Sequence, residues 1–366
     1  MRESAEVRRR RILATVQARG EVRLTELAGD LEVSIITIRR DIEDLTRAGK
    51  LRRGHGVARP VVPVQRAEPA AEPAGGTVGI VVPERHAYLY ETMNGAREVL
   101  QAAGVRPALL IAPQAPGTER PIVERALADG VRGLLLAPRW RSAAVEEGDY
   151  AWLADATAEV PAVLMERRPR PGSLLHAMDS VCSDHWYGVH LAVDHLLRLG
   201  HRRIVLAARD DSPTARAVRA AFAAIAAERS DGETWDVIYS APDAGADHGP
   251  GTPVELAALL RKRGATAAVL HGDVDALMLV QQLADAGLKV PQDCSVVAYD
   301  DVVAALGNPP LTAIAPPKAE VGRMAAELLL RRLGRGGKDG GAPPGSRVEL
   351  LPRLEVRGST QAATTV

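Results

Sequence analysis

The chain has 366 residues, 46% of them hydrophobic, and its 46 Lys and Arg balance its 46 Asp and Glu. This length is too great for one small domain and sufficient for a large buried core. The two cysteines, Cys182 and Cys294, offer neither a disulfide framework nor a metal-binding pattern. No stretch approaches the ~20 apolar residues of a membrane span, and the arginine-rich start is unlike a signal peptide. We therefore expect a soluble cytoplasmic protein.

Charge is distributed unevenly along the chain. Residues 1–60 hold 14 Lys and Arg against 9 Asp and Glu, a net charge of +5 that leaves −5 for the remainder. A basic head on an acidic body is typical of a DNA-binding module joined to a sensor domain. Chance clustering of charges is the alternative.

The first 60 residues predict a helix-turn-helix followed by a basic wing. A basic helix starts at Arg8 and runs to about Arg19, and a second helix covers residues 25–31 with leucines inward. After a three-residue turn, Ser34 begins the third helix as its N-cap. A short strand and turn follow at residues 49–56. The third helix places one apolar stripe on a single face, formed by Ile35, Ile38, Ile42 and Leu45.

The other face of the third helix suits the major groove of DNA. It carries Ile36, Thr37 and Arg40, with Arg39 on its flank. Arginine forks match guanine edges or phosphates, and a methyl-bearing side chain can meet thymine. An ordinary amphipathic surface helix is the alternative interpretation. With the basic wing included, the predicted DNA-binding residues are Ser34, Ile36, Thr37, Arg39, Arg40, Arg52, Arg53 and His55.

At these residues the chain resembles a known DNA-binding family. Val33-Ser34, Thr37 through Asp41 and the later Gly49-Lys50-Leu51 with His55-Gly56 resemble the DeoR-type winged helix-turn-helix over about residues 5–58. Val57 stands where that motif has a second glycine. The resemblance implies a double-stranded DNA operator as partner, with the third helix as the recognition helix.

Proline-rich residues 60–76 predict a semi-extended linker between a DNA-binding domain at 1–59 and a second domain at 77–360. In that second domain apolar runs alternate with helical patterns, and the alternation restarts near residue 180. Continuously apolar strands between helices are typical of βαβ units with buried parallel sheets. The predicted fold class is therefore α/β, with two doubly wound lobes and a cleft. Strands are expected at 78–82, 108–112, 133–137, 162–165, 203–207, 236–239, 267–270 and 295–299, and helices at 88–103, 121–129, 188–199, 214–228, 253–263 and 276–286.

The second domain resembles the effector domain of the LacI family, itself similar to periplasmic sugar-binding proteins. The matching segments are Asp184 with His195–Ile204, Gly287–Asp301, Pro310–Ile314 and Arg357–Thr360. The resemblance spans about residues 77–360 and implies a homodimer, a small-molecule effector and no cofactor. Because the head is of DeoR type, we expect a hybrid regulator, most simply a repressor. The tail after Thr360 lacks leucine heptads, so no coiled-coil tetramer is expected.

The effector should bind where strands end, because doubly wound sheets bind ligands at the carboxyl ends of their strands. Asp300 follows the strand at 295–299 and matches the family's ligand-contacting aspartate, although a structural cap is the alternative. Glu166 follows the strand at 162–165 and contacts either ligand or Arg167 or Arg168. Asp273 occupies the second position of the family's Asn-Asp pair, with Gly272 in place of the amide.

Four further candidates lie at connections near the cleft. Tyr88 and Tyr90 stack on a sugar face or belong to the core, and the same choice applies to Arg139 beside Trp140. The family places an arginine at Val218, which Arg216 or Arg219 is expected to replace, with a solvated helix surface as the alternative for both. Acidic groups around the cleft favour a neutral polyhydroxylated effector, a sugar or nucleoside. The predicted effector-binding residues are thus Tyr88, Tyr90, Arg139, Glu166, Arg216, Asp273 and Asp300.

Other functions find little support in the sequence. No nucleophile elbow, phosphate-binding loop or His-Glu-x-x-His motif occurs, and His185, His190 and His195 are spaced by five, which does not suit a metal site. We therefore expect neither catalysis nor a metal. An enzyme acting on a sugar or nucleoside in the cleft, or a constitutive DNA-binding protein with a purely structural body, remain the alternative functions.

Overall fold

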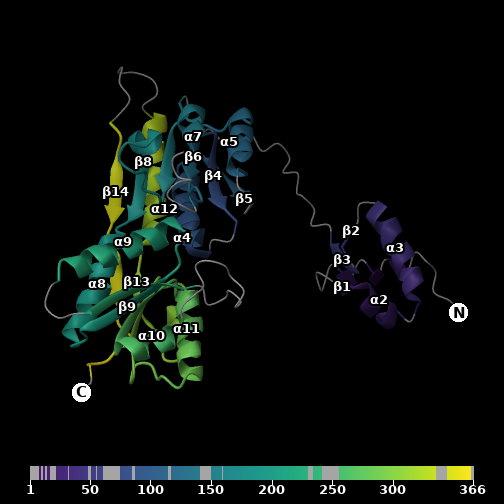
Figure 1. Ribbon diagram of the computed structural model, residues 1–366. Helices are drawn as coiled ribbons and strands as arrows, with labels where there is room; N and C mark the ends of the chain where they lie inside the picture. Colours follow the sequence, from purple (N-terminus) through teal and green to yellow (C-terminus); the bar gives the residue numbers. More distant parts are fainter. Residues whose placement is uncertain are drawn as a thin grey trace. The chain divides into compact units, whose positions relative to one another are not determined.

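The computed structural model divides the chain into two compact units, the head (Met1–Glu72) and the body (Pro73–Val366) (Figure 1). Most of the predicted linker, residues 61–74, lies outside the described residues, as does His55, and the side chains of Arg52 and Arg53 are not described. The structure describes residues 8–9, 11–12, 15–16, 22–31, 33–47, 51–54, 56–60, 75–84, 87–113, 117–140, 150–158, 160–229, 234–240, 255–334 and 344–363.

The head contains the expected helix-turn-helix and wing. Residues 8–9, 11–12 and 15–16 are helical, and they precede α2 (Leu24–Asp30) and α3 (Ile35–Arg47). Strands β1 (Val22–Arg23), β2 (Leu51–Arg53) and β3 (Val57–Pro60) form an antiparallel sheet in the order β1-β3-β2. Whereas the sequence predicts the linker from residue 60, Pro60 still pairs with Leu51. Proline is tolerated there because it ends the strand.

One apolar cluster holds the described part of the head together. The leucines expected to face inward on the second helix are buried, as are Ile38, Ile42 and Leu45 of the α3 stripe. Ile35, at the start of that stripe, is only half-buried. The remaining buried members come from the first helical residues and the sheet: Ile12, Val16, Val22, Leu51 and Ala58.

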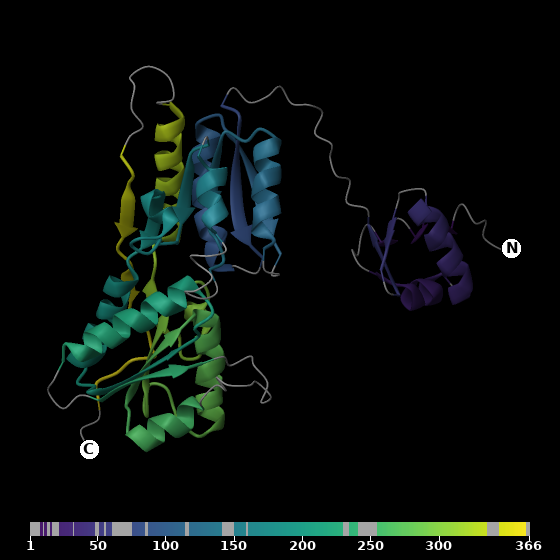
Figure 2. The same ribbon diagram turned by 45° about the horizontal axis from the view of Figure 1, so that its top comes forward.

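The body consists of two lobes, each a six-stranded sheet with helices on both faces (Figure 2). In lobe 1 all strands are parallel, in the order β14-β8-β7-β6-β4-β5. Its strands are β4 (Thr77–Pro83), β5 (Arg106–Ala112), β6 (Gly133–Leu136), β7 (Ala162–Met165), β8 (Asp179–Ser183) and β14 (Arg347–Leu350). Its helices are α4 (Ala87–Ala102) and α12 (Lys318–Gly334) on one face, and α5 (Glu119–Ala128) and α7 (Ala151–Ala156) on the other.

Lobe 2 repeats this architecture in the order β10-β9-β11-β12-β13-β15, with only β15 antiparallel to its neighbour. Its strands are β9 (Arg203–Ala208), β10 (Thr234–Tyr239), β11 (Ala267–His271), β12 (Ser295–Tyr299), β13 (Thr312–Ala315) and β15 (Arg353–Glu355). Helices α8 (His185–Arg198) and α9 (Pro213–Ala227) cover one face, and α10 (Leu256–Arg263) and α11 (Asp273–Asp285) the other. Short 3-10 helices occur at η1 (Leu174–Ala177) and η2 (Ala304–Leu306).

The lobes are not consecutive stretches of chain. The chain leaves lobe 1 after β8, returns after β13 to add α12 and β14, and ends in lobe 2 with β15. Figure 1 shows α12 and β14, in yellow, in lobe 1, where β14 pairs with β8 at one edge of the sheet. The two βαβ series were predicted, whereas α7, β8, β13, α12, β14 and β15 were not. Three passages of the chain therefore connect the lobes.

Helices α4 and α12 pack at very close range in lobe 1. A Cβ atom on Gly322 would lie 1.8 Å from the Thr92 carbonyl oxygen, and one on Gly95 would lie 2.1 Å from that of Ala319. Atoms cannot approach so closely, so the crossing requires glycine at both positions. The returning helix is thus fitted backbone to backbone against the first helix of the body.

The motif histidines of lobe 2 hold the end of the chain. His201 Nδ1 lies 2.9 Å from Thr266 Oγ1 and its Nε2 lies 3.0 Å from the Gln361 carbonyl, while His195 Nε2 lies 3.0 Å from Thr360 Oγ1. These histidines therefore have structural partners.

None of the helices in the described part of the chain combines the length and the apolar character that a membrane span requires.

Candidate functional site

The recognition helix α3 presents a polar face, as its pattern predicts. Ser34 Oγ accepts a hydrogen bond from the Thr37 backbone N–H at 3.2 Å, so Ser34 is the N-cap. Ile36 is 74% exposed, which is unusual for a large apolar side chain, and Arg39 and Arg40 are exposed beside it. A solvent-facing isoleucine flanked by arginines provides apolar contact and hydrogen-bond donors on one helix face.

An acidic residue that the sequence reasoning missed anchors this helix. Asp41 is 2% exposed, and its carboxylate accepts hydrogen bonds from Arg8 Nε at 2.6 Å and Arg9 Nε at 2.8 Å. Arg9 also pairs with Asp44. The detectable signal was an aspartate between Ile38 and Ile42 on the buried face. Two of the basic residues in the first helix therefore neutralise a buried carboxylate inside the head.

The wing is connected directly to the helices. Gly54 N–H donates to the Val57 carbonyl at 2.9 Å across the tip of the hairpin. Leu24 N–H, at the start of α2, donates to the Gly56 carbonyl at 3.0 Å. Gly56 has φ +73°, the left-handed region that favours glycine. These bonds fix the hairpin, on which Arg52 and Arg53 remain predicted DNA contacts.

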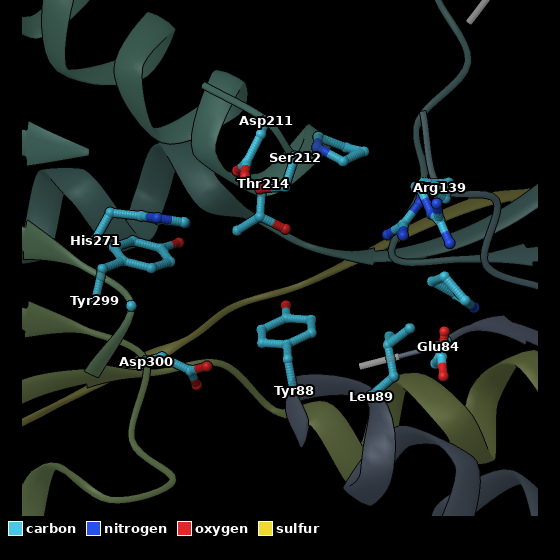
Figure 3. Close-up of a pocket in the computed structure, with 14 residues that line it drawn as sticks. Glu84, Tyr88, Leu89, Arg139, Asp211, Ser212, Thr214, His271, Tyr299 and Asp300 are labelled. Carbon is cyan, nitrogen blue, oxygen red and sulfur yellow. The ribbon is translucent and has the colours of Figure 1, made fainter. Parts of the chain in front are cut away.

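In the body, a cavity of about 360 Å³ opens between the two lobes. Figure 3 shows Tyr88 and Leu89 on one side, the start of α9 opposite, and His271 with Tyr299 at one end. Three of the predicted effector residues, Tyr88, Arg139 and Asp300, line it. The full lining is Pro83, Glu84, Tyr88, Leu89, Arg139, Arg167, Asp211, Ser212, Pro213, Thr214, His271, Gly272, Tyr299 and Asp300.

Asp300 lies at the carboxyl end of β12, as expected, but its carboxylate already has a partner. The residue has φ 111°, and the carboxylate pairs with Lys318 Nζ. Burial raises the pKa of Asp300 to about 6, against the opposing effect of Lys318. At neutral pH the carboxylate is therefore mostly ionised and available as a hydrogen-bond acceptor.

Arg167, considered from the sequence only as a partner for Glu166, is a lining residue. It is 6% exposed, its Nη1 donates to the Glu166 carbonyl at 2.7 Å, and its Nε bonds the Pro138 carbonyl. Burial lowers its pKa, although the guanidinium stays charged. Two bonds to backbone carbonyls thus fix a charged donor at the cavity wall.

Two aromatic rings form the end of the cavity. His271 and Tyr299 are the last residues of β11 and β12, and their ring centroids are 6.3 Å apart in a stacked arrangement. Tyr299 Oη lies 3.0 Å from His185 Nδ1 behind it. Burial lowers the pKa of His271 to about 4, so this imidazole is neutral at pH 7. The sequence reasoning selected Asp273 and Asp300, which lie two and one residues beyond these strand ends, and missed both rings.

Four predicted effector residues lie outside the lining. Tyr90 is 63% exposed on α4. Arg216 Nη2 donates across the lobes to the Trp140 carbonyl at 2.6 Å. The Asp273 carboxylate accepts the backbone N–H groups of Val302, Val303 and Ala304, which caps η2.

Glu166, the fourth, is 3% exposed and accepts bonds from Ser183 N–H at 3.1 Å and Ser183 Oγ at 2.8 Å. Its carboxylate lies 3.8 Å from His185 Nε2. Neither ion pair anticipated for it is formed among the described residues; Arg168 pairs instead with Glu349. Glu166 therefore supports the cavity from behind.

The rim that α9 contributes was also missed. Ser212 is the N-cap of α9, and its Oγ accepts the Ala215 N–H at 3.1 Å. Asp211 and Thr214 lie on either side of it and line the cavity with it. The signal was available in the Ser-Pro pair that starts this helix. Carboxylates, guanidinium groups, hydroxyls and aromatic rings thus converge here, and the described residues contain no cluster of metal-ligating side chains.

Comparison with known proteins separates the two parts of the chain. Residues 8–62 match the DeoR-like helix-turn-helix domain, and residues 193–360 match the periplasmic binding protein-like domain. The arabinose metabolism transcriptional repressor of Geobacillus stearothermophilus is 27% identical over 92% of this chain and 90% of its own. The HTH-type transcriptional repressor PurR of Haemophilus influenzae is 31% identical over 57% of this chain and 60% of its own.

A solved structure agrees with the fold of the body. A LacI family transcriptional regulator from Enterococcus faecium with bound ribose has a TM-score of 0.61 and 24% identity, and the match covers 79% of this chain and 100% of that one. The chain thus consists of a helix-turn-helix head and a two-lobed body with a periplasmic-binding-protein-like fold. Its architecture combines a head similar to DeoR-like helix-turn-helix domains with a body similar in fold to LacI family regulators.

Proposed function

We propose that the chain is a ligand-responsive transcriptional repressor that binds operator DNA as a homodimer and senses a sugar or nucleoside between its lobes. The observation that carries the proposal is the cavity, whose polar lining comes from both lobes of the body. A ligand that contacts both lobes favours one lobe arrangement over another, and only such differential affinity can shift DNA binding.

The chemistry of the lining supports a polyhydroxylated effector. Asp300 and Arg167 supply an ionic acceptor and an ionic donor, and Thr214 with Ser212 supplies hydroxyls. Tyr88 and Tyr299 offer aromatic surfaces to the apolar face of a sugar ring or to a base. Arabinose is the first candidate, because the Geobacillus relative that aligns along most of this chain is named for arabinose metabolism.

The effector assay uses a matched pair of tyrosine variants. Tyr88→Phe removes a hydroxyl from the cavity while keeping the ring, and Tyr90→Phe makes the same change at an exposed position of the same helix. L-Arabinose, D-ribose, D-glucose and adenosine would be titrated in a thermal-shift assay. A compound that raises the melting temperature of the wild type should bind Tyr88→Phe about tenfold more weakly and Tyr90→Phe unchanged. If Tyr88→Phe binds the compound as tightly as Tyr90→Phe does, the site lies elsewhere.

The repressor assay needs an operator, which selection from random duplexes with the full-length protein would supply. We expect two half-sites, as a dimer requires. Fluorescence anisotropy would then follow the complex while the stabilising compound is added. If the protein concentration at half-saturation of the operator does not change with the compound, the protein is not a ligand-responsive repressor. The DNA-binding assignment would still stand.

The dimer prediction can be tested at an exposed strand. Leu109 and Ile111 on edge strand β5 are each 52% exposed. Apolar side chains on an exposed edge strand are typical of a protein interface. Leu109→Asp should shift the protein toward monomer in light scattering at micromolar concentration, whereas Arg120→Asp on exposed α5 should not. A tetrameric wild type would contradict the proposed assembly.

A further inference from the structure

Lys318 lies behind the effector cavity in an unusual position. It is 3% exposed, although lysine is among the residues least often buried. It is the first residue of α12, which packs in lobe 1, and its Nζ pairs with Asp300 at the end of β12 in lobe 2. The same Nζ lies 4.9 Å from the centroid of the Tyr88 ring. One ammonium group therefore contacts two lining residues from different lobes without lining the cavity itself.

The ion pair leaves the Asp300 carboxylate asymmetric. Oδ1 pairs with Lys318 and also accepts the Asp301 backbone N–H at 2.9 Å. Both of these contacts are made by Oδ1 and not by Oδ2. Because Asp300 lines the cavity, Oδ2 is the oxygen left for a ligand. While the carboxylate is ionised, this oxygen can accept hydrogen bonds but cannot donate one.

The balance of forces on this carboxylate depends on Lys318. Burial of Asp300 raises its pKa to about 6, and the charge and hydrogen bond of Lys318 are the strongest opposing influences. A buried carboxylate without a partner would take up a proton instead of remaining charged. With its proton, Asp300 would offer the cavity a donor in place of an acceptor.

We propose that Lys318 is the positioning residue of the effector site: it holds Asp300 ionised and turned so that Oδ2 faces the cavity. The effector must then bring an O–H or N–H donor to that oxygen. This inference rests on the proposed function for its meaning. Its physical content, the control of one carboxylate by one buried ammonium, is independent of which effector binds.

Few other charges act on the pair. Asp273 of α11 raises the pKa of Asp300 by repulsion, but its own carboxylate is held by the N-terminus of η2. The Asp301 carboxylate pairs with Arg357 at 2.7 Å. Among the described residues, two titratable tyrosines also interact with Asp300, and burial raises the pKa values of both, so that they stay neutral: Tyr88 of α4 and Tyr299 of β12.

The test measures the pH dependence of unfolding, which requires no ligand. All four tryptophans lie in the body, so their fluorescence follows the unfolding of that unit in the full-length protein. Lys318→Met keeps the length of the side chain and removes its charge. Lys289→Met, at an exposed lysine of lobe 2, is the matched control. Asp300→Asn and the double variant Lys318→Met/Asp300→Asn complete the cycle.

The expected loss in Lys318→Met grows with pH. Without Lys318 the pKa of Asp300 rises further, so the folded state holds a proton that the unfolded state has released. Stability is then lost as pH rises, and the melting temperature should be near that of the wild type at pH 5 and ~5–10 °C lower at pH 8. In the double variant, which lacks the carboxylate, most of this loss and of its dependence on pH should disappear. Lys289→Met should follow the wild type.

Parallel pH profiles for Lys318→Met and the wild type would overturn the proposal, because Lys318 would not control the ionisation of Asp300. If Lys318→Met does not fold at any pH, the double variant decides: recovered folding supports the pair, and continued unfolding overturns it. The sugar and nucleoside titrations test a separate claim. If they all fail while the pH profiles behave as expected, the proposed function is wrong and the role of Lys318 stands.

Discussion

The recognition helix and the effector cavity are assembled in opposite ways. The polar face of α3 comes from a single helix of 13 residues, and its exposed side chains Ile36, Arg39 and Arg40 are neighbours in sequence. The cavity collects residues from β4, α4, α9, β11 and β12 and from the segments after β6 and β7. A helix face follows from local periodicity alone, whereas a cavity depends on how distant segments are arranged.

This difference teaches where mutations should act. In the head, the predicted DNA contacts and the buried side chains lie on opposite faces of α3, so single substitutions should separate DNA binding from folding. In the body, the segments that line the cavity also connect the lobes, as Asp300 with Lys318 and Arg216 with Trp140 demonstrate. Changes there should affect stability and ligand binding together.

The largest effect is expected where α12 returns to lobe 1. Gly322→Ala would place a methyl group 1.8 Å from the Thr92 carbonyl oxygen, a backbone atom that cannot move aside cheaply. We expect the body to lose about 3 kcal/mol or more of stability, measured by urea unfolding with tryptophan fluorescence. Gly334→Ala, which meets nothing within 4 Å, is the control. Equal stability of both variants would mean that the helices do not pack as closely as described.

The second effect should be confined to the head. Asp41→Ala would leave Arg8, whose side chain is only 13% exposed, without its carboxylate partner. Arg9 is partly solvated, so the loss of its partner costs less than it does for Arg8. We therefore expect the head to lose about 2–3 kcal/mol of unfolding free energy. Hydrogen exchange of the α3 amides in the full-length protein would measure it, with body amides unchanged. Faster exchange in the body as well would contradict the expectation that the head unfolds independently of the body. Glu26→Ala, at an exposed site of α2, is the control and should change exchange in neither unit.

A third prediction separates reading of bases from contact with phosphates. Arg40→Ala should reduce the preference for the operator over random DNA by roughly 1–3 kcal/mol if Arg40 contacts a base. Arg52→Ala should weaken binding to all sequences about equally and flatten the salt dependence. Gel shifts at two salt concentrations would distinguish these results. Arg120→Ala, on α5 of the body, is the control for loss of charge, and unchanged binding in both head variants would refute the helix-and-wing assignment.

The smallest effect concerns acid stability. The pKa of His271 is about 4 in the folded state and ~6.5 when unfolded, so the unfolded state binds more protons between these values. Stability contributed by neutral His271 is therefore lost as pH falls from ~6.5 toward 4. In His271→Gln, the decrease in unfolding free energy between pH 7.5 and pH 5 should be about 1–2 kcal/mol smaller than in the wild type.

Circular dichroism melts would measure this difference, with His190→Gln on α8 as control because His190 does not line the cavity. Asp300 titrates in the same range with the opposite sign, so each variant is compared with the wild type at the same pH. A steeper acid loss in His271→Gln would show that the imidazole is already protonated in the folded protein.

The candidate effector residues show why the cavity was only partly predictable. Asp273 and Asp300 both follow strands at the same sheet edge, and no local pattern distinguishes them. The backbone N–H groups of η2 occupy the Asp273 carboxylate, whereas Asp300 keeps one oxygen toward the cavity. Glu166 is similarly engaged by Ser183. Which carboxylate is free depends on partners 17 to 31 residues away, and periodicity carries no such information.

The sequence by itself determined the helix-turn-helix, the N-cap at Ser34, the two βαβ series and the strand ends near which the cavity lies. Each of these depends on interactions within a few residues, such as hydrophobic period, capping and turn chemistry. Only the tertiary structure decided that α12 and β14 return to lobe 1 and that Lys318 reaches Asp300 across the lobes. It also decided that Asp41 is neutralised by Arg8 and Arg9. Those contacts join residues far apart in the chain, and burying a charge is favourable only where its partner is already placed.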